Sequence, residues 1–107
     1  MQARQRAVAR FVRRHGLETD VAHRLLDVVS ELGEVAKEVL KGSAYGSAGF
    51  TAPKAWQDEL GDVVFSLMCV ANTTGVDLDE ALQGALAKYR RRLSQTGAAS
   101  SSGKSHT

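Results

Sequence analysis

The chain has 107 residues, of which 14 are Lys or Arg and 12 are Asp or Glu, for a formal net charge of +2. This length allows one domain with a modest core, and small domains often oligomerise, so a helical dimer is expected. The single cysteine, Cys69, excludes an internal disulfide and suits a reducing compartment. No apolar run reaches the length of a membrane span and the start lacks a secretory h-region, so we expect a cytoplasmic protein.

Four helices and no strands are predicted from the apolar periodicity. The first covers residues 3–15 and ends at His15-Gly16. Its Arg-rich, acid-free sequence also fits a mitochondrial presequence, but Val8, Phe11 and Val12 favour a helix that packs. The second covers 20–41, begins at a Thr19 or Asp20 cap, and ends at Gly42, where a left-handed residue is commonly needed.

A loop of small residues, 42–50, separates the second helix from a third over 52–73, with Pro53 in its first turn. The run 63–71 is the most apolar of the chain, so this should be the central helix. Asp77 and Glu80 resemble a capping box that opens a fourth helix, 78–94, with Leu82, Leu86 and Leu93 expected to be buried. We therefore expect an all-α, four-helix bundle-like domain over 1–96 that dimerises, followed by a disordered tail, 97–107.

Charge is segregated along the chain. Residues 18–80 hold four basic and all twelve acidic residues, a net charge of −8, whereas 1–17 and 81–107 each hold five basic residues and no acid. An acidic, cation-binding centre inside a basic rim would suit a polyanion that arrives with metal. Basic termini that simply neutralise an acidic middle explain the pattern equally well.

Two acidic motifs stand out, Glu31-x-x-Glu34 in the second helix and Glu59-x-x-Asp62 in the third. A spacing of three residues puts each pair on one helical face, so two neighbouring helices could direct four carboxylates to one point. Such carboxylates repel one another unless a cation lies among them. A divalent metal site is therefore the first hypothesis.

An ordinary solvated face is the competing interpretation, because Asp27, Glu31, Glu34 and Glu38 follow helical spacing opposite the apolar stripe. The third helix favours the metal site. Its polar stripe is narrow and its other positions are nearly all apolar, so Glu59 and Asp62 should be partly buried and need compensation. A neighbouring Arg, or a raised pKa that keeps a carboxyl neutral, would also compensate for the burial of these acids. If a metal does, an all-oxygen ligand set favours Mg²⁺, with Mn²⁺ as a substitute.

Two further features carry weaker hypotheses. Trp56 is either a core or interface anchor or part of a base pocket. The basic cluster Lys88 and Arg90 to Arg92 either clamps phosphate oxygens or complements the helix dipole. Nucleic acid is an unfavoured partner, because few aromatic residues accompany the cluster and the acidic centre repels a phosphate backbone.

A family resemblance rests on these residues. The segments SELGEVAKEVL (30–40), DELGDVVFSLMCVANTTGVDLDEAL (58–82) and AKYRRRL (87–93) resemble the MazG-type all-α nucleoside triphosphate pyrophosphohydrolases over roughly 20–93. The most specific part is the pair of acidic motifs at this separation, together with the later basic cluster.

The resemblance implies a helical dimer or tetramer that binds Mg²⁺ and hydrolyses the α–β phosphoanhydride of a nucleoside triphosphate to a monophosphate and pyrophosphate. Carried over by position, the metal ligands are Glu31, Glu34, Glu59 and Asp62, and one of these or Glu38 accepts the proton of the attacking water. Lys88 and Arg92, with Arg91 beside them, are expected to meet the phosphates, and Asn72 the nucleotide.

This sequence departs from the family pattern at two positions. Ser30 stands where many relatives have a further acid, and Tyr89 where they often have Asn. The number of metals, the base and the sugar therefore stay open, as does the choice between clearing aberrant nucleotides and trimming normal pools. The alternatives are a dUTPase- or dCTPase-like enzyme, a phosphoribosyl-ATP pyrophosphohydrolase, a non-catalytic helical dimerisation module, and a small nucleic-acid binder.

Overall fold

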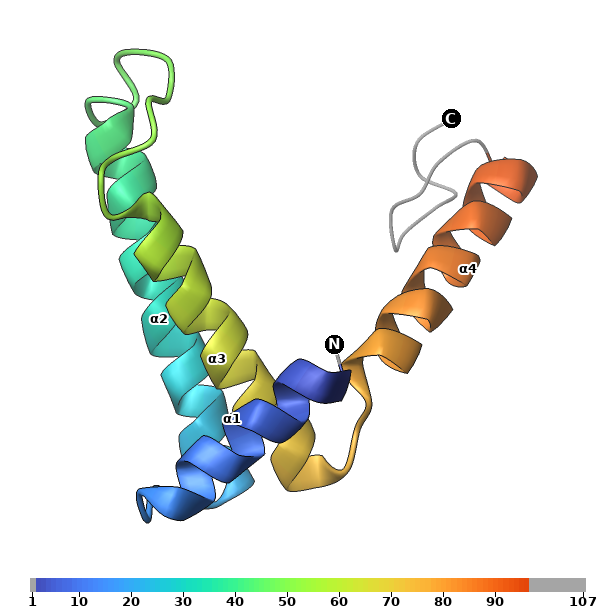
Figure 1. The fold of residues 1–107 in the computed structure, drawn as a ribbon. Helices are drawn as coiled ribbons and strands as arrows, with labels where there is room; N and C mark the ends of the chain where they lie inside the picture. The colour runs from blue at the N-terminus through green and yellow to red at the C-terminus, as the bar shows by residue number, and fades with distance from the viewer. Residues whose placement is uncertain (1, 97–107) are drawn as a thin grey trace.

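The computed structural model describes residues 2–96, which form four helices and no strand (Figure 1). They are α1 (Gln2–Arg14), α2 (Val21–Gly42), α3 (Trp56–Thr74) and α4 (Leu78–Thr96). The predicted all-α fold is confirmed. The expected disordered tail, 97–107, lies outside the described residues.

The helix ends agree with local sequence signals at four places. Asp20 caps α2, because its Oδ1 accepts the His23 backbone N–H at 2.8 Å, a bond that lowers the pKa of Asp20. Asp77 caps α4 by accepting from the backbone N–H of Asp79 at 2.9 Å. Gly16 and Gly75 end their helices with positive φ values of 64° and 70°.

The start of α3 and the end of α2 differ from prediction. Helix α3 begins at Trp56 rather than 52, because the chain makes a separate turn in which the Trp56 N–H donates to the Pro53 carbonyl. Gly42 is the last residue of α2 and is not left-handed; Ala44 and Tyr45 have positive φ instead. A Cβ on Gly42 would lie 2.5 Å from the Thr51 carbonyl oxygen, so close approach of the returning chain requires this glycine.

Helices α2 and α3 form an antiparallel hairpin, and α1 crosses the far end of α3 (Figure 1). Helix α3 is central as predicted, since it packs against both α1 and α2. The buried apolar residues of the described part are Met68, Cys69 and Ala71, all on α3. Burial raises the pKa of the Cys69 thiol, so this side chain packs as a neutral group.

Gln5 is a buried polar residue that ties three helices together. Its Nε2 donates to the Asn72 side chain at 3.2 Å and to the Val76 carbonyl at 2.9 Å, and its Oε1 accepts the Leu78 N–H at 2.8 Å. Asn72 in turn donates to the Gln5 carbonyl at 2.9 Å. These bonds fix the end of α3 and the first residue of α4 against α1.

Helix α4 leaves the other helices and extends away from the hairpin (Figure 1). The expectation that its leucines are buried is wrong within one chain, because Leu82, Leu86 and Leu93 are 49, 44 and 51 % exposed. No packing partner reaches this face inside the described chain. Large apolar side chains are also exposed on the other helices, among them Phe11, Leu26, Val29, Leu32 and Val64.

None of the described helices combines the length and the apolar character needed to cross a lipid bilayer.

Candidate metal centre

Three carboxylates meet between α2 and α3. The antiparallel pairing places Glu31 of α2 beside Glu59 and Asp62 of α3, and one oxygen from each lies within 4.8 Å of the others. Glu31 and Glu59 are half-buried and Asp62 is exposed. The pairing of acidic motifs that was predicted from spacing is therefore present for three of its four residues.

The fourth predicted ligand, Glu34, and the candidate base, Glu38, lie outside this group of three. Glu34 is 3.5 Å from the Lys37 ammonium, and Glu38 is 3.8 Å from that of Lys41. The Glu38 side chain is nevertheless only 13 % exposed. Both residues follow Glu31 at helical spacing, so all three acids line the same side of α2.

The acids of both helices act on Glu59. Partial desolvation raises the pKa of Glu59, and the negative charges of Glu34, Asp62, Glu31 and Glu38 raise it further. Lys37 and Lys41 pair with Glu34 and Glu38 rather than with the group of three. Within residues 2–96, Glu31, Glu59 and Asp62 thus have no basic ion-pair partner, and the meeting point of α2 and α3 carries net negative charge.

This arrangement fits a hard divalent cation. Carboxylate oxygens from two rigid helices are the ligand type that Mg²⁺ and Mn²⁺ prefer, and the exposed Asp62 leaves the site open to water or a phosphate. Glu31, Glu59 and Asp62 would hold the ion, with Glu34 within electrostatic reach.

Two of the three groups expected to bind substrate, Asn72 and the basic cluster, lie away from the acids, whereas Trp56 precedes Glu59 by about one helical turn. Trp56 packs against the Phe50 ring, with centroids 5.1 Å apart, at the loop end of the hairpin. Asn72 lies ten residues beyond Asp62, about 15 Å along α3, and its amide is bonded to Gln5. The basic cluster, with Lys88, Arg91 and Arg92, is on α4, away from the hairpin (Figure 1).

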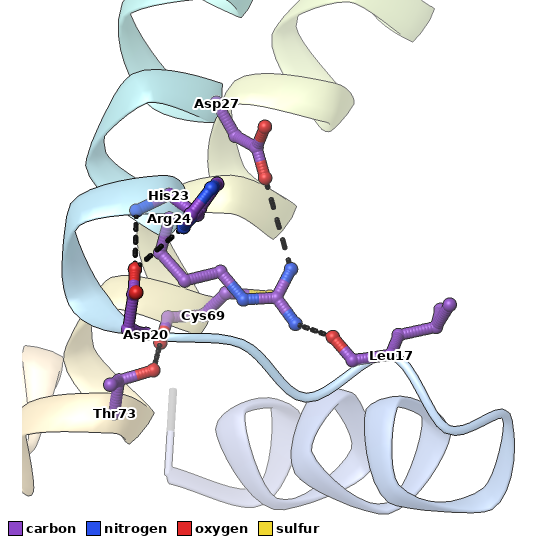
Figure 2. Close-up of polar contacts among 7 residues, drawn as sticks. All are labelled: Leu17, Asp20, His23, Arg24, Asp27, Cys69 and Thr73. Atoms are coloured by element: carbon purple, nitrogen blue, oxygen red, sulfur yellow. Dashed lines mark hydrogen bonds and ion pairs between the residues drawn. The ribbon is translucent and has the colours of Figure 1, made fainter.

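Two polar residues were missed by the sequence reasoning, Gln5 and Arg24. Arg24 is buried, with a side chain 10 % exposed, beside Cys69 (Figure 2). Its Nη2 donates to the Leu17 carbonyl, and its Nη1 lies 3.9 Å from Asp27. The sequence held one signal for Arg24. It precedes Glu31 by seven residues, about two helical turns, so it lies on the same face of α2 as the candidate metal ligand. Gln5 had no comparable signal.

Comparisons with known proteins agree with the resemblance. The family model described as the MazG nucleotide pyrophosphohydrolase domain matches residues 21–96. An uncharacterized protein of Bacillus subtilis, YpjD, is 37 % identical over 68 residues, a match covering 61 % of this chain and 60 % of the relative. No solved structure matches.

The match to the family model spans α2, α3 and α4, and therefore includes both acidic motifs and the basic cluster. The carboxylates that this segment brings together lie at the meeting point of α2 and α3. The chain belongs to the MazG nucleotide pyrophosphohydrolase domain family.

Proposed function

We propose that this protein is a Mg²⁺-dependent nucleoside triphosphate pyrophosphohydrolase that cleaves the α–β phosphoanhydride and releases a nucleoside monophosphate and pyrophosphate. The observation that carries the proposal is the group Glu31, Glu59 and Asp62, with oxygens within 4.8 Å, inside the segment matched by the family model.

In this reaction the bound cation and the acids would have different roles. A divalent ion supplies charge neutralisation for the phosphates and makes a nearby water more acidic. Water attacks phosphorus, the phosphoanhydride P–O bond breaks, and pyrophosphate leaves with the bonding electron pair. The water proton passes to a carboxylate of this chain, for which Glu59 and the nearby Glu38 are the candidates.

Phosphate contacts are assigned to Lys88, Arg91 and Arg92. Within one chain these residues are on α4, which does not pack on the hairpin, whereas the phosphates must lie beside the acids. We therefore propose that the chain functions as a homodimer, or a tetramer built from dimers. Assembly would cover the exposed leucines of α4 and bring its cations to the acids of the partner.

The proposal is tested by incubating the protein with Mg²⁺ and a panel of canonical and modified nucleoside triphosphates. Pyrophosphate and orthophosphate are measured separately. We expect pyrophosphate, with turnover reduced at least about a hundredfold by Glu59→Gln. Glu80→Gln, the same substitution at an exposed residue of α4, is the matched control and should retain activity.

The panel also separates the related enzymes. A dUTPase- or dCTPase-like enzyme would use one pyrimidine nucleotide, and a phosphoribosyl-ATP pyrophosphohydrolase would leave ordinary nucleoside triphosphates intact. The absence of any pyrophosphate release, combined with a melting temperature that Mg²⁺ and nucleotide leave unchanged, would overturn the proposal in favour of a non-catalytic helical module.

A further inference from the structure

Helix α4 gathers two cations around one aromatic ring. The Lys88 Nζ lies 5.2 Å from the centroid of the Tyr89 ring, and the Arg92 Cζ lies 5.7 Å from it. Both distances fall within the roughly 6 Å over which a cation is attracted to the face of an aromatic ring. Lys88 and Arg92 are half-buried, whereas Arg90 and Arg91 are exposed. The ring therefore contacts the two less exposed side chains of the basic cluster.

The contact with the ring offsets repulsion between the two cations. Lys88 and Arg92 are four residues apart, so they lie on one face of α4, and like charges at this spacing destabilise a helix. Residues 81–96 contain no Asp or Glu, and within residues 2–96 the Lys88 ammonium forms no ion pair. A carboxylate would neutralise these cations, whereas an uncharged ring attracts them and leaves their full charge available to a phosphate.

Tyr89 lies at the edge of the apolar face of α4. At about 100° per residue, its position falls between that of the three exposed leucines and that of the two cations. Tyr89 is itself 40 % exposed. In the proposed assembly, a partner hairpin covers the leucines, so the ring would lie at the rim of that contact with Lys88 and Arg92 beside it. The ring is thus placed to hold the cations next to the partner's surface.

We propose that Tyr89 is a positioning residue, whose ring holds the Lys88 ammonium and the Arg92 guanidinium together as a pair that binds consecutive phosphates of one polyphosphate. The inference rests on the proposed function and narrows its substrate class. Two cations one helical turn apart suit a chain of phosphates better than an isolated phosphate, because each cation can meet a different phosphate. The ring acts through the cations and not on the reacting atoms.

Calorimetric binding of inorganic tripolyphosphate in the presence of Mg²⁺ tests this role without turnover. Tyr89→Leu keeps an apolar side chain but removes the ring, so we expect binding to weaken about fivefold. The KM for the nucleotide should rise by a similar factor, with kcat little changed. Tyr89→Phe keeps the ring and should retain both values within about twofold. Tyr45→Leu, the same change at an exposed tyrosine between α2 and α3, is the matched control.

A double-mutant cycle separates positioning from packing. In a background with Lys88→Gln and Arg92→Gln, Tyr89→Leu should cause no further loss of tripolyphosphate binding, because the ring then has no cation to hold. A loss of the same size in this background would show that Tyr89 acts by packing alone, and would overturn the inference. Equal losses from Tyr89→Phe and Tyr89→Leu would overturn it as well.

Fluorination of the ring provides the test if Tyr89→Leu fails to fold, or if the cation-free background binds too weakly to measure. Tyr89→Phe carrying one, two or three ring fluorine atoms keeps the shape of the side chain while the negative potential of the ring face weakens stepwise. Binding of tripolyphosphate should weaken with each added fluorine. A binding constant that does not depend on fluorination would reject the role of the ring.

The same measurements separate this inference from the proposed function. Ring-dependent binding of tripolyphosphate without hydrolysis of any nucleoside triphosphate would retain the positioning role and reject the proposed reaction. Pyrophosphate release with a KM that Tyr89→Leu leaves unchanged would retain the reaction and reject the role of Tyr89. If the unmodified protein did not bind tripolyphosphate, the paired cations, and with them the role of Tyr89, would be rejected.

Discussion

The α2–α3 hairpin and helix α4 differ in how extensively they pack against the rest of the chain. The hairpin packs along its length, carries the buried residues of α3, and brings three acidic side chains within 4.8 Å. Among the described residues, helix α4 is bonded to α1 at its first residue, Leu78, but has no extensive packing against another helix; it exposes Leu82, Leu86 and Leu93 and carries Lys88 and three arginines. The acids are therefore positioned by two packed helices, and the cations by a helix that, among residues 2–96, extends away from the hairpin.

This difference indicates which part of the proposed site each region can complete alone. A cation site needs only the two packed helices, because its ligands already converge. In the proposed function, phosphate recognition needs α4 to meet a hairpin, and burial of the apolar surface on α4 would favour that step by roughly 25 cal/mol per Å² of apolar area removed from water. The most direct test places the defect in the hairpin acids and the defect in the α4 cations on different chains.

Complementation between two variants that are impaired at low substrate concentration should give the largest effect. Glu59→Gln removes an acid of the hairpin, and Lys88→Ala removes a cation of α4. If each site combines one hairpin with the partner's α4, mixed dimers contain one intact site, and a co-expressed pair should recover about a quarter of wild-type activity. Pyrophosphate release at low substrate concentration measures the recovery.

The matched control for Lys88→Ala is Lys54→Ala, the same change in the exposed segment before α3. It should leave KM unchanged, whereas Lys88→Ala should raise KM about tenfold through loss of a charge-assisted hydrogen bond. Co-expression that yields no more activity than the average of the two variants would show that the acids and cations of one site come from the same chain.

Removal of the Gln5 side chain tests the hydrogen bonds that connect the end of α3 and the start of α4 to α1. Gln5→Ala leaves the Leu78 N–H, the Val76 carbonyl and the Asn72 Oδ1 without their side-chain partner, so the free energy of unfolding should fall by about 1–3 kcal/mol. Chemical denaturation measures the loss, and Gln2→Ala, an exposed glutamine of the same helix, is the control. If the free energy of unfolding of Gln5→Ala were unchanged, the position of α4 would not depend on the Gln5 hydrogen bonds.

The smallest expected effect is a pH dependence confined to the hairpin. The pKa of Glu59 is raised above its ordinary value of 4.5 by desolvation and by the neighbouring acids. In the metal-free protein, its contribution to stability is therefore present below the unfolded pKa and is lost as pH rises through the folded pKa. Mg²⁺ binds the ionised carboxylate. The stabilisation of the protein by Mg²⁺ should therefore increase as pH rises through the folded pKa of Glu59.

Melting temperatures with and without Mg²⁺ across pH 4–7 check this expectation. Glu59→Gln should flatten the metal-free dependence and reduce the response to Mg²⁺, while Glu80→Gln should do neither. A Mg²⁺ response that does not change with pH would contradict the assignment of Glu59 as a ligand.

Local signals in the sequence were sufficient for the helices and for much of the acidic site. Asp20 and Asp77 act as caps because their short carboxylates accept nearby backbone N–H groups, an interaction decided within a few residues. The three-residue spacing of the acids likewise determines their face on each helix. Gly42 was misread because a glycine after an apolar run serves either a left-handed turn or a close approach, and only the path of residues 50–51 distinguishes them.

The amino-acid sequence by itself determined four helices, their caps, and the faces on which acids and bases lie, because these depend on spacing within single helices. Only the tertiary structure decided that Glu31, Glu59 and Asp62 converge while Glu34 and Glu38 pair with lysines, since that depends on the register of α2 against α3. It also decided that Gln5 and Arg24 are buried and that α4 stands apart from the hairpin. The reason is physical: burial and long-range polar contacts arise where distant segments meet, and no local spacing encodes that meeting.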